Sequence, residues 1–383
     1  MSNEVQQQYL ERVRLRYRKG NKKQKTLILD EFTQICDITR KHAIRLLNED
    51  LKVNSPRPGP KVIYGPNIHE HILILWQKMG RICSKKIVAA IPIWLPFYYG
   101  INPEETLQLK KISASSIDRI LSKHRDKINK GISSTEPSLI KNKIPIKLLD
   151  EAIKEPGYIE ADTVAHCGNS LAGEFINTLT MTDLFSSWTE NRAVWKKEAL
   201  TVMKAISSIE ESLPFSIKGF ATDNGNEFLN HDLHSYFFNR KNRVDFVRRR
   251  PYKKNDNAHV EQKNWTHVRE LFGYDRFDHL NQVEWMNDTY QRLWNPLWNY
   301  FTPVMKLQSK VRVGGKIIKV YDDPKTPYQR LMDSTLLTPE QTLALESNFK
   351  NLNPFELKKE LEEKLKWFFR IAEIRRKQMS DAG

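Results

Sequence analysis

From Gly157 onward, the chain repeats a short pattern that constrains its fold more than any other feature. Three runs rich in Thr, Ile, Val and aromatic residues follow one another across polar turns: "GYIEADTVAH", "EFINTLTMTD" and "SWTENRAVW". Such runs are typical of β-strands. A segment with helical spacing, "KKEALTVMKAISSIEE", comes next, followed by a fourth strand-like run, "FSIKGFATDNG". Three strands in a meander, a helix, a strand and further helices predict a multidomain α/β protein whose core at 150–300 surrounds a mixed sheet.

The N-terminal third has the texture of short helical pairs. In "KQKTLILDEFTQICDITRKHAIRLLNED", Leu27, Phe32 and Ile35 fit one helix, and Thr39 can cap a second. Arg40, Lys41 and Arg45 would then face outward on the second helix.

Two short helices with an exposed basic second helix form a helix-turn-helix, whose second helix reads the major groove of DNA. Residues 1–60 hold thirteen Lys and Arg against seven Asp and Glu, which favours this interpretation. The alternative is a helical hairpin with a solvated face. We predict a helix-turn-helix DNA-binding domain at 1–54.

A proline-rich stretch, "SPRPGPK", separates this domain from the next helices and predicts a linker. Arg57, on its extended backbone, could lie in a minor groove. Further short helices follow in "NIHEHILILWQKM", "CSKKIVAAI" (with Ser84 as a cap) and "PEETLQLKKISASSIDRILSKHRDK" (with Ser113 as a cap). They predict a second helical DNA-binding region at 66–130, for which a purely structural role is an equal alternative.

The part of the chain after the core predicts two smaller regions. "SKVRVGGKIIKVYD" is typical of a hairpin and places a small β domain at 301–335. C-terminal helices follow at 336–383. The last helix is capped by Asn353, begins at Pro354 and carries a buried stripe of Leu357, Leu361, Leu365, Phe368 and Ala372.

The overall charge, the cysteine usage and the hydropathy indicate the class of partner and the cellular compartment of the protein. A formal net charge of +16 makes nucleic acid the leading partner. Three widely separated cysteines argue against a disulfide framework and a cysteine-rich zinc module. The most apolar run, "IPIWLPFYYG", is short and holds two prolines, so we expect no membrane segment. A cytoplasmic, nucleoid-associated protein is expected.

Two acids stand at informative positions in the predicted sheet. Asp162 lies among apolar neighbours in the first strand, "YIEADTV". Asp223 ends the fourth strand, where Gly225 turns the chain. The carboxyl end of a strand is where functional groups gather in open sheets.

A third acid, Glu261, lies in the stretch "RRRPYKKNDNAHVEQKN", which is otherwise strongly basic. Spacings of four, three and four residues place Glu261, Trp265, Val268 and Phe272 on one inward helical face. An inward carboxylate is costly unless it is paired or bound to metal, and an internal salt bridge is the simplest alternative for any single one.

Three acids that converge would repel one another without a cation between them. Carboxylate oxygens with no nearby Cys or His cluster suit Mg²⁺ or Mn²⁺. Two such ions would clamp the attacking and leaving oxygens of a phosphodiester displacement.

The three acidic motifs together resemble those of a known protein family. Residues 157 to about 300 resemble the integrase catalytic core of the DDE transposases and retroviral integrases, within the ribonuclease H-like fold. The matching pieces are "EADTVAH", "TDNGNEF" and "RPYKKNDNAHVEQKN", with sixty residues between the first two acids and thirty-seven between the last two. The whole layout, including "YDDPKTPYQRLM", is similar to bacterial insertion-sequence transposases. The N-terminal zinc module of retroviral integrases has no counterpart.

The resemblance implies that Asp162, Asp223 and Glu261 are the catalytic residues and hold two Mg²⁺ or Mn²⁺ ions. It implies a transposase that cleaves and joins the terminal inverted repeats of its own element. Its partners would be double-stranded DNA and further copies of the chain, at least as a homodimer. Two alternatives stay open: a catalytically silent DNA-binding regulator, and a metal-dependent nuclease of the same fold.

Other residues near these acids receive lesser roles. Those expected to position the DNA backbone are Tyr252, Lys253, Lys254, Lys263 and Asn264. Glu160 shares a strand face with Asp162 and is interpreted as a solvated rim residue, with a further charge in the pocket as the alternative. His166 is interpreted as a loop residue, with a role near the scissile phosphate as the alternative.

Overall fold

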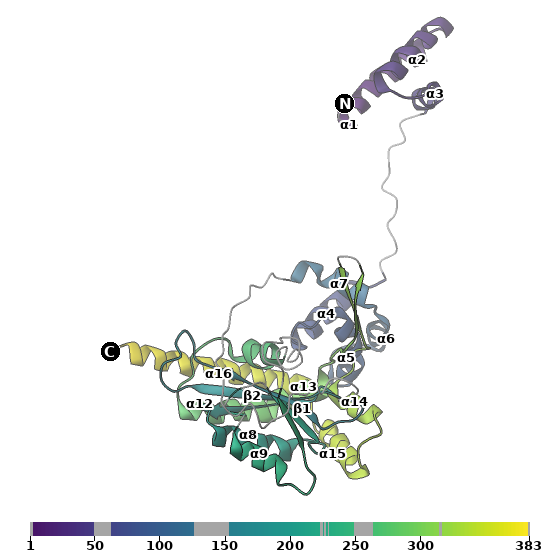
Figure 1. Cartoon of the computed structure of the whole chain (residues 1–383). Coiled ribbons are helices and arrows are strands. Elements are labelled where there is room, and N and C mark those ends of the chain that lie inside the picture. Colours follow the sequence, from purple (N-terminus) through teal and green to yellow (C-terminus); the bar gives the residue numbers. More distant parts are fainter. Residues whose placement is uncertain are drawn as a thin grey trace. The chain divides into compact units, whose positions relative to one another are not determined.

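The computed structural model describes residues 3–49, 63–125, 153–222, 225, 227–228, 230–248, 263–313 and 316–381. The chain divides into two compact units, Met1–Ile63 and Tyr64–Gly383, each with its own hydrophobic core. Figure 1 shows the whole chain with its elements labelled.

The first unit is a bundle of three helices, α1 (Asn3–Lys19), α2 (Lys22–Cys36) and α3 (Arg40–Asn48). The predicted helical pair is present as α2 and α3, and α1 packs against both. Leu27 and Ile35 of the predicted first helix are 69% and 47% exposed, because the buried face of α2 runs through Ile28, Leu29 and Phe32. Thr39 occupies the N-cap position of α3, but its side chain makes no capping hydrogen bond.

Short helices open the second unit: α4 (Pro66–Lys78), α5 (Ser84–Trp94), η1 (Leu95–Phe97), α6 (Pro103–Lys111), α7 (Ala114–Leu121) and η2 (Ser122–His124). Ser113 caps α7 as predicted, since its side chain accepts a hydrogen bond from the backbone of Ser116. The predicted cap at Ser84 is wrong, because Cys83 holds the N-cap position. The Ser84 hydroxyl instead donates to Asp118 at 2.9 Å.

The predicted meander and the strand after it form a mixed five-stranded sheet. Its strands are β1 (Tyr158–Ala165), β2 (Ile176–Asp183), β3 (Thr189–Trp195), β4 (Gly219–Thr222) and β5 (Asp245–Arg248). Their order is β3-β2-β1-β4-β5. The first three pair antiparallel, whereas β4 runs parallel to β1 and β5 parallel to β4. The predicted multidomain α/β class with a mixed sheet is confirmed.

Helices cover both faces of this sheet. Neighbouring strand residues point to opposite faces. Arg192 of β3 donates to Ser212 of α8 (Ala199–Ser212) at 3.0 Å, while the adjacent Asn191 lies 2.9 Å from His267. Therefore α8 covers one face, beside α9 (His231–Phe238) (Figure 1). The segment of His267 covers the other face. The helices α12 (Leu280–Thr289), η5 (Tyr290–Trp294) and α13 (Asn295–Phe301) also pack against β3.

The helices of 64–125 share one hydrophobic core with the sheet region. The indole nitrogen of Trp94 in α5 donates to the carbonyl of Phe301 in α13 at 3.0 Å. The same indole contacts Phe355 edge to face. The second helical region is therefore packed onto the core through buried aromatic side chains.

The C-terminal part begins with the predicted hairpin, β6 (Leu307–Val313) and β7 (Lys316–Tyr321). Three helices follow: α14 (Pro327–Asp333), α15 (Pro339–Lys350) and α16 (Pro354–Asp381). The start of α16 at Pro354 agrees with the prediction, and Leu361, Phe368 and Ala372 of its stripe are buried. Within the described part of the chain, none of the helices combines the length and apolarity needed to cross a membrane.

Candidate active site

Asp162 lies on the central strand of the sheet, half-buried, and two groups hold its carboxylate. Oδ1 accepts a hydrogen bond from the backbone N–H of Thr163 at 2.8 Å. Oδ2 accepts one from the Asn264 side-chain amide at 2.6 Å. Because both oxygens have donors from different segments, the orientation of this carboxylate is well defined.

The strand beside Asp162 leads toward the second predicted acid. Ala161 pairs with Thr222, which is the last described residue of β4. Asp223 follows Thr222 in the chain and lies outside the described residues, as does Glu261. The same holds for four predicted DNA contacts, Arg57, Tyr252, Lys253 and Lys254.

The described chain resumes just after Glu261 and continues as a π-helix, η4 (Asn264–Arg269), and the short helix α11 (Glu270–Phe272). Val268 and Phe272 are fully buried, as predicted, but Trp265 is 39% exposed. The prediction of an inward Trp265 is therefore wrong. A π-helix has a wider turn than an α-helix, so the α-helical spacing used for the prediction does not apply here.

Lys263 and Asn264, both predicted as DNA contacts, face the interior in the structure. Lys263 is 6% exposed, and its amine lies 4.4 Å from the ring centroid of Trp298, with no hydrogen-bond partner among the described residues. Burial, together with the nearby Lys86 and Arg330 charges, lowers the pKa of Lys263 well below its usual range. Asn264 contacts Asp162, and Lys263 packs against Trp298, so neither is directed outward as predicted.

A row of polar side chains crosses the sheet from Asp162. Asp162 pairs with Thr180, and Thr180 pairs with Asn191, so all three share one face. Asn191 donates to the Thr180 hydroxyl at 2.9 Å and lies 2.9 Å from Nδ1 of His267. The indole nitrogen of Trp294 is 3.0 Å from the same nitrogen of His267. This network fixes η4, which follows Glu261 in the chain, on the face that carries Asp162.

Two of the residues that received lesser roles, Glu160 and His166, are buried. His166 follows β1 and lies outside the strand, as expected. Glu160 is fully buried, so its interpretation as a solvated rim residue is wrong. His166 is also fully buried, with Nε2 at 2.8 Å from the Thr178 hydroxyl and its ring against Phe277. It is therefore part of the packing under the sheet.

Burial lowers the pKa of two histidines, His166 and His267. The pKa of His166 falls to about 3. We expect the free energy of unfolding to decrease as the pH falls below about 6.5, because histidines of the unfolded chain then bind protons that the buried ones do not. Between pH 7 and 5.5 each should contribute a loss of about 1 kcal/mol. Urea unfolding at both pH values measures this difference in the free energy of unfolding. His166→Gln should remove its share, and an unchanged difference would contradict the assignment.

A further acid, Glu227, lies near Asp162 and was not singled out from the sequence. Its side chain is 4% exposed, and Oε1 accepts a hydrogen bond from the Thr163 hydroxyl at 3.0 Å. The amine of Lys197 is 2.5 Å from the same oxygen. Its place in "TDNGNEF", next to the fully buried Phe228, was the signal that could have indicated an inward position.

The predicted DNA-binding residues of α3 lie at the surface of the first unit. Arg40 and Arg45 are 48% and 66% exposed, and Lys41 is exposed. Arg40 forms an ion pair with Asp30, and Arg45 lies 3.9 Å from Glu49. Exposed pairs of this kind are weak, so both cations remain accessible to an anionic ligand.

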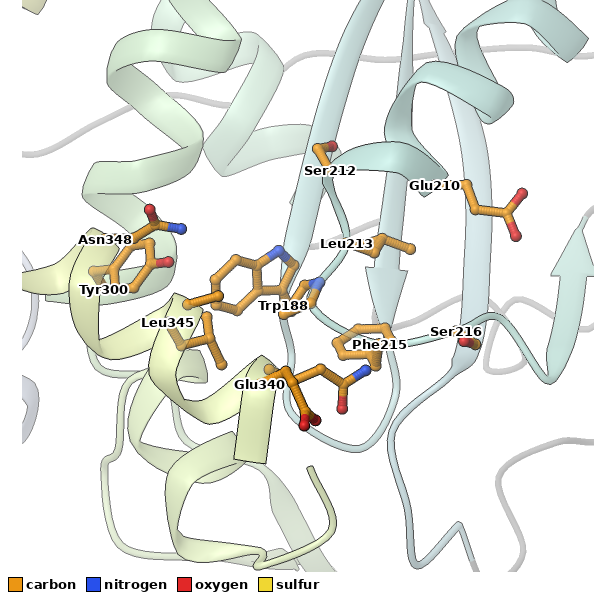
Figure 2. A pocket seen from close by; sticks show the side chains of 13 residues that line it. Trp188, Glu210, Ser212, Leu213, Phe215, Ser216, Tyr300, Glu340, Leu345 and Asn348 are labelled. Atoms are coloured by element: carbon orange, nitrogen blue, oxygen red, sulfur yellow. The ribbon is translucent and has the colours of Figure 1, made fainter. Parts of the chain in front are cut away.

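An open groove of about 480 Å³ lies elsewhere in the second unit (Figure 2). Trp188, Leu213, Phe215 and Leu345 form its apolar lining, with Glu340 at its edge. None of the predicted site residues lines it, so it is separate from the candidate active site.

The three predicted metal ligands are carboxylates, whose hard oxygens fit Mg²⁺ or Mn²⁺. Asp162 is the one that the structure describes, on a strand that also places Thr163 and Asn264 around it. Among the described residues, no three His, Cys, Asp or Glu side chains are grouped to hold a metal.

The solved structures to which the chain is similar include three of retroviral integrases. The catalytic core domain of BIV integrase is 15% identical, with a TM-score of 0.30, over 47% of this chain and 95% of that chain. The HTLV-2 integrase catalytic core domain in complex with magnesium is 17% identical, with a TM-score of 0.24, over 30% and 69%. The simian T-cell lymphotropic virus intasome in complex with PP2A regulatory subunit B56 gamma is 13% identical, with a TM-score of 0.30, over 63% and 74%. TM-scores this low support no conclusion about function.

Comparison of sequences gives a clearer relationship. No protein-family model matches the chain. "Uncharacterized protein y4rM" of Sinorhizobium fredii (strain NBRC 101917 / NGR234) is 33% identical over 329 residues, which cover 82% of this chain and 91% of that protein. Identity at this level over most of both chains indicates common descent. The chain therefore belongs to the same protein family as y4rM of Sinorhizobium fredii.

Proposed function

We propose that the protein is a DNA transposase that cleaves and joins the terminal inverted repeats of an insertion sequence. The observation that carries the proposal is the position of Asp162 on the central strand, one residue beyond the last described pair between β1 and β4. In this proposal Asp162, Asp223 and Glu261 form one acidic site.

The register of the two parallel strands supports a meeting of the first two acids. Ala161 is paired with Thr222, and Asp162 and Asp223 are the next residue in each chain segment. Each acid is therefore one residue, or about 3.8 Å of backbone, beyond a residue of this pair. Acids at the same level of two neighbouring parallel strands are suitably arranged to share a cation.

The contacts of Asn264 support the approach of the third acid. Asn264 donates to Asp162 at 2.6 Å and is three residues from Glu261 in the chain. The buried Lys263 and the hydrogen-bonded His267 hold the same segment against the sheet. In the proposed site, these chain neighbours would bring Glu261 close to Asp162.

Such a site suits phosphodiester chemistry. Two bound divalent ions would supply charge stabilisation for the attacking and leaving oxygens. Asp162 contributes an oriented carboxylate, and Asn264 and Thr163 keep it oriented. Water would first hydrolyse a strand to leave a 3′-hydroxyl and a 5′-phosphate. The 3′-hydroxyl would then attack a phosphodiester of the target and displace a 3′-hydroxyl of the target strand, so no covalent link between protein and DNA is required.

The exposed basic residues of α3 would supply DNA contacts. Arg40, Lys41 and Arg45 are exposed on α3 and suit a phosphate backbone or the major groove. Because two DNA ends must be joined, the working form would contain at least two copies of the chain.

The test is incubation of the protein with labelled terminal repeats, a target plasmid and Mg²⁺. Joined products support the transposase. Cut ends without joining would support the nuclease, and intact DNA that is only retarded on a gel would support the regulator.

A further inference from the structure

Glu227 is a buried acid that the proposed chemistry does not use. Its side chain is 4% exposed, and Lys197 Nζ lies 2.5 Å from Oε1. A buried carboxylate needs such a partner, and this ion pair balances its charge. The same oxygen also accepts a hydrogen bond from Thr163 Oγ1 at 3.0 Å.

These three residues join three separate segments of the core. Thr163 lies on β1 directly after Asp162, Lys197 lies between β3 and α8, and Glu227 lies between β4 and α9. The described backbone ladder between β1 and β4 ends at Ala161 and Thr222. Beyond that pair, the Thr163–Glu227 hydrogen bond links β1 to the segment that follows β4.

The link continues from Thr163 to the catalytic carboxylate. The backbone N–H of Thr163 donates to Asp162 Oδ1 at 2.8 Å, while its hydroxyl donates to Glu227. A shift of Thr163 would therefore move a donor of Asp162. Gly225 provides the room, because a Cβ there would lie 2.5 Å from Glu227 Oε2.

We propose that Glu227 is a positioning residue of the active site, acting through Thr163 on Asp162 and held by Lys197. It fixes the orientation of the Asp162 carboxylate and ties β1 to the chain between β4 and α9, so that Asp162 can receive a divalent cation. The role rests on the proposed function, since it presumes that Asp162 is a metal ligand. Residues that orient metal ligands typically change metal affinity by about 10- to 100-fold when they are replaced.

Mn²⁺ binding to the full chain without DNA, followed by electron paramagnetic resonance, tests the proposal. We expect at least about tenfold weaker Mn²⁺ binding in Glu227→Ala and in Thr163→Val, which keeps the side-chain shape but removes the hydroxyl. Hydrogen exchange at the Thr163 amide should accelerate in Glu227→Ala. The matched control is Glu210→Ala, which removes the acid of a partly buried pair with Arg240 and should leave both readouts unchanged.

The outcomes distinguish a failure of the proposed role of Glu227 from a failure of the proposed function. Mn²⁺ affinity like that of the wild type in both variants would overturn the role of Glu227, even if amide exchange changes. If Glu227→Ala does not fold, Thr163→Val decides. If the wild type itself binds no Mn²⁺, the proposed function fails, and Thr163 exchange in Glu227→Ala alone decides whether Glu227 orients this strand.

Discussion

Asp162→Asn is expected to reduce the joining of labelled DNA ends to a target plasmid by about a thousandfold or more, because it removes the negative charge that holds the cation. The substitution also disturbs the contacts of the carboxylate. If the new amide oxygen keeps the hydrogen bond from the Thr163 backbone, its NH₂ group faces the Asn264 amide, which is a donor at 2.6 Å in the wild type. The variant should still bind terminal-repeat DNA, because the exposed cations of α3 are unchanged.

The matched control for this variant is Asp245→Asn, the same substitution on the edge strand β5, where the side chain is exposed. Its joining activity should stay within about threefold of the wild type, since substitutions at exposed positions away from a site have small effects. Joining by Asp162→Asn at the rate of the control would exclude Asp162 from the chemistry.

The sheet could be predicted from the sequence because each strand carries its own local signal. The runs through Asp162, "EFINTLTMTD" and "SWTENRAVW" became β1, β2 and β3. The edge strand β5 was missed, since Asp245–Arg248 is short and is followed by further arginines. The packing of α5 on α13 could not be predicted from local sequence patterns, because Trp94 and Phe301 are 207 residues apart in the chain.

Of the three predicted acids, the structure describes Asp162. Asp162 lies on the first strand, β1, as expected. The surroundings of Lys263 could not be predicted, because they depend on Trp298, which comes from a different helix. The role of Glu227 depends on Thr163 and Lys197, which are distant in sequence, so local patterns could not indicate it. Trp265 was placed wrongly because a π-helical turn has no clear sequence signature.

Gly157→Ala is expected to lower the free energy of unfolding by about 3–5 kcal/mol, from two causes that add. Gly157 has a φ of +111°, which L side chains rarely adopt, and an added Cβ would collide with the backbone carbonyl oxygen of Ser216. The backbone cannot easily move away. Its N–H donates to Asp183 at 2.9 Å, and its carbonyl accepts from Lys218 and Gly219 at 2.8 and 3.1 Å, where β1 and β4 begin.

Gly80→Ala separates the two causes, because Gly80 has a φ of +75° and no atom within 4 Å of an added Cβ. That variant should lose about 1 kcal/mol, the cost of the backbone conformation alone. Urea unfolding of both variants, followed by circular dichroism, measures the difference. Equal losses would mean that the start of β1 can shift without cost. In that case the register between β1 and β4, on which the proposed meeting of Asp162 and Asp223 depends, would be less firmly fixed than these contacts imply.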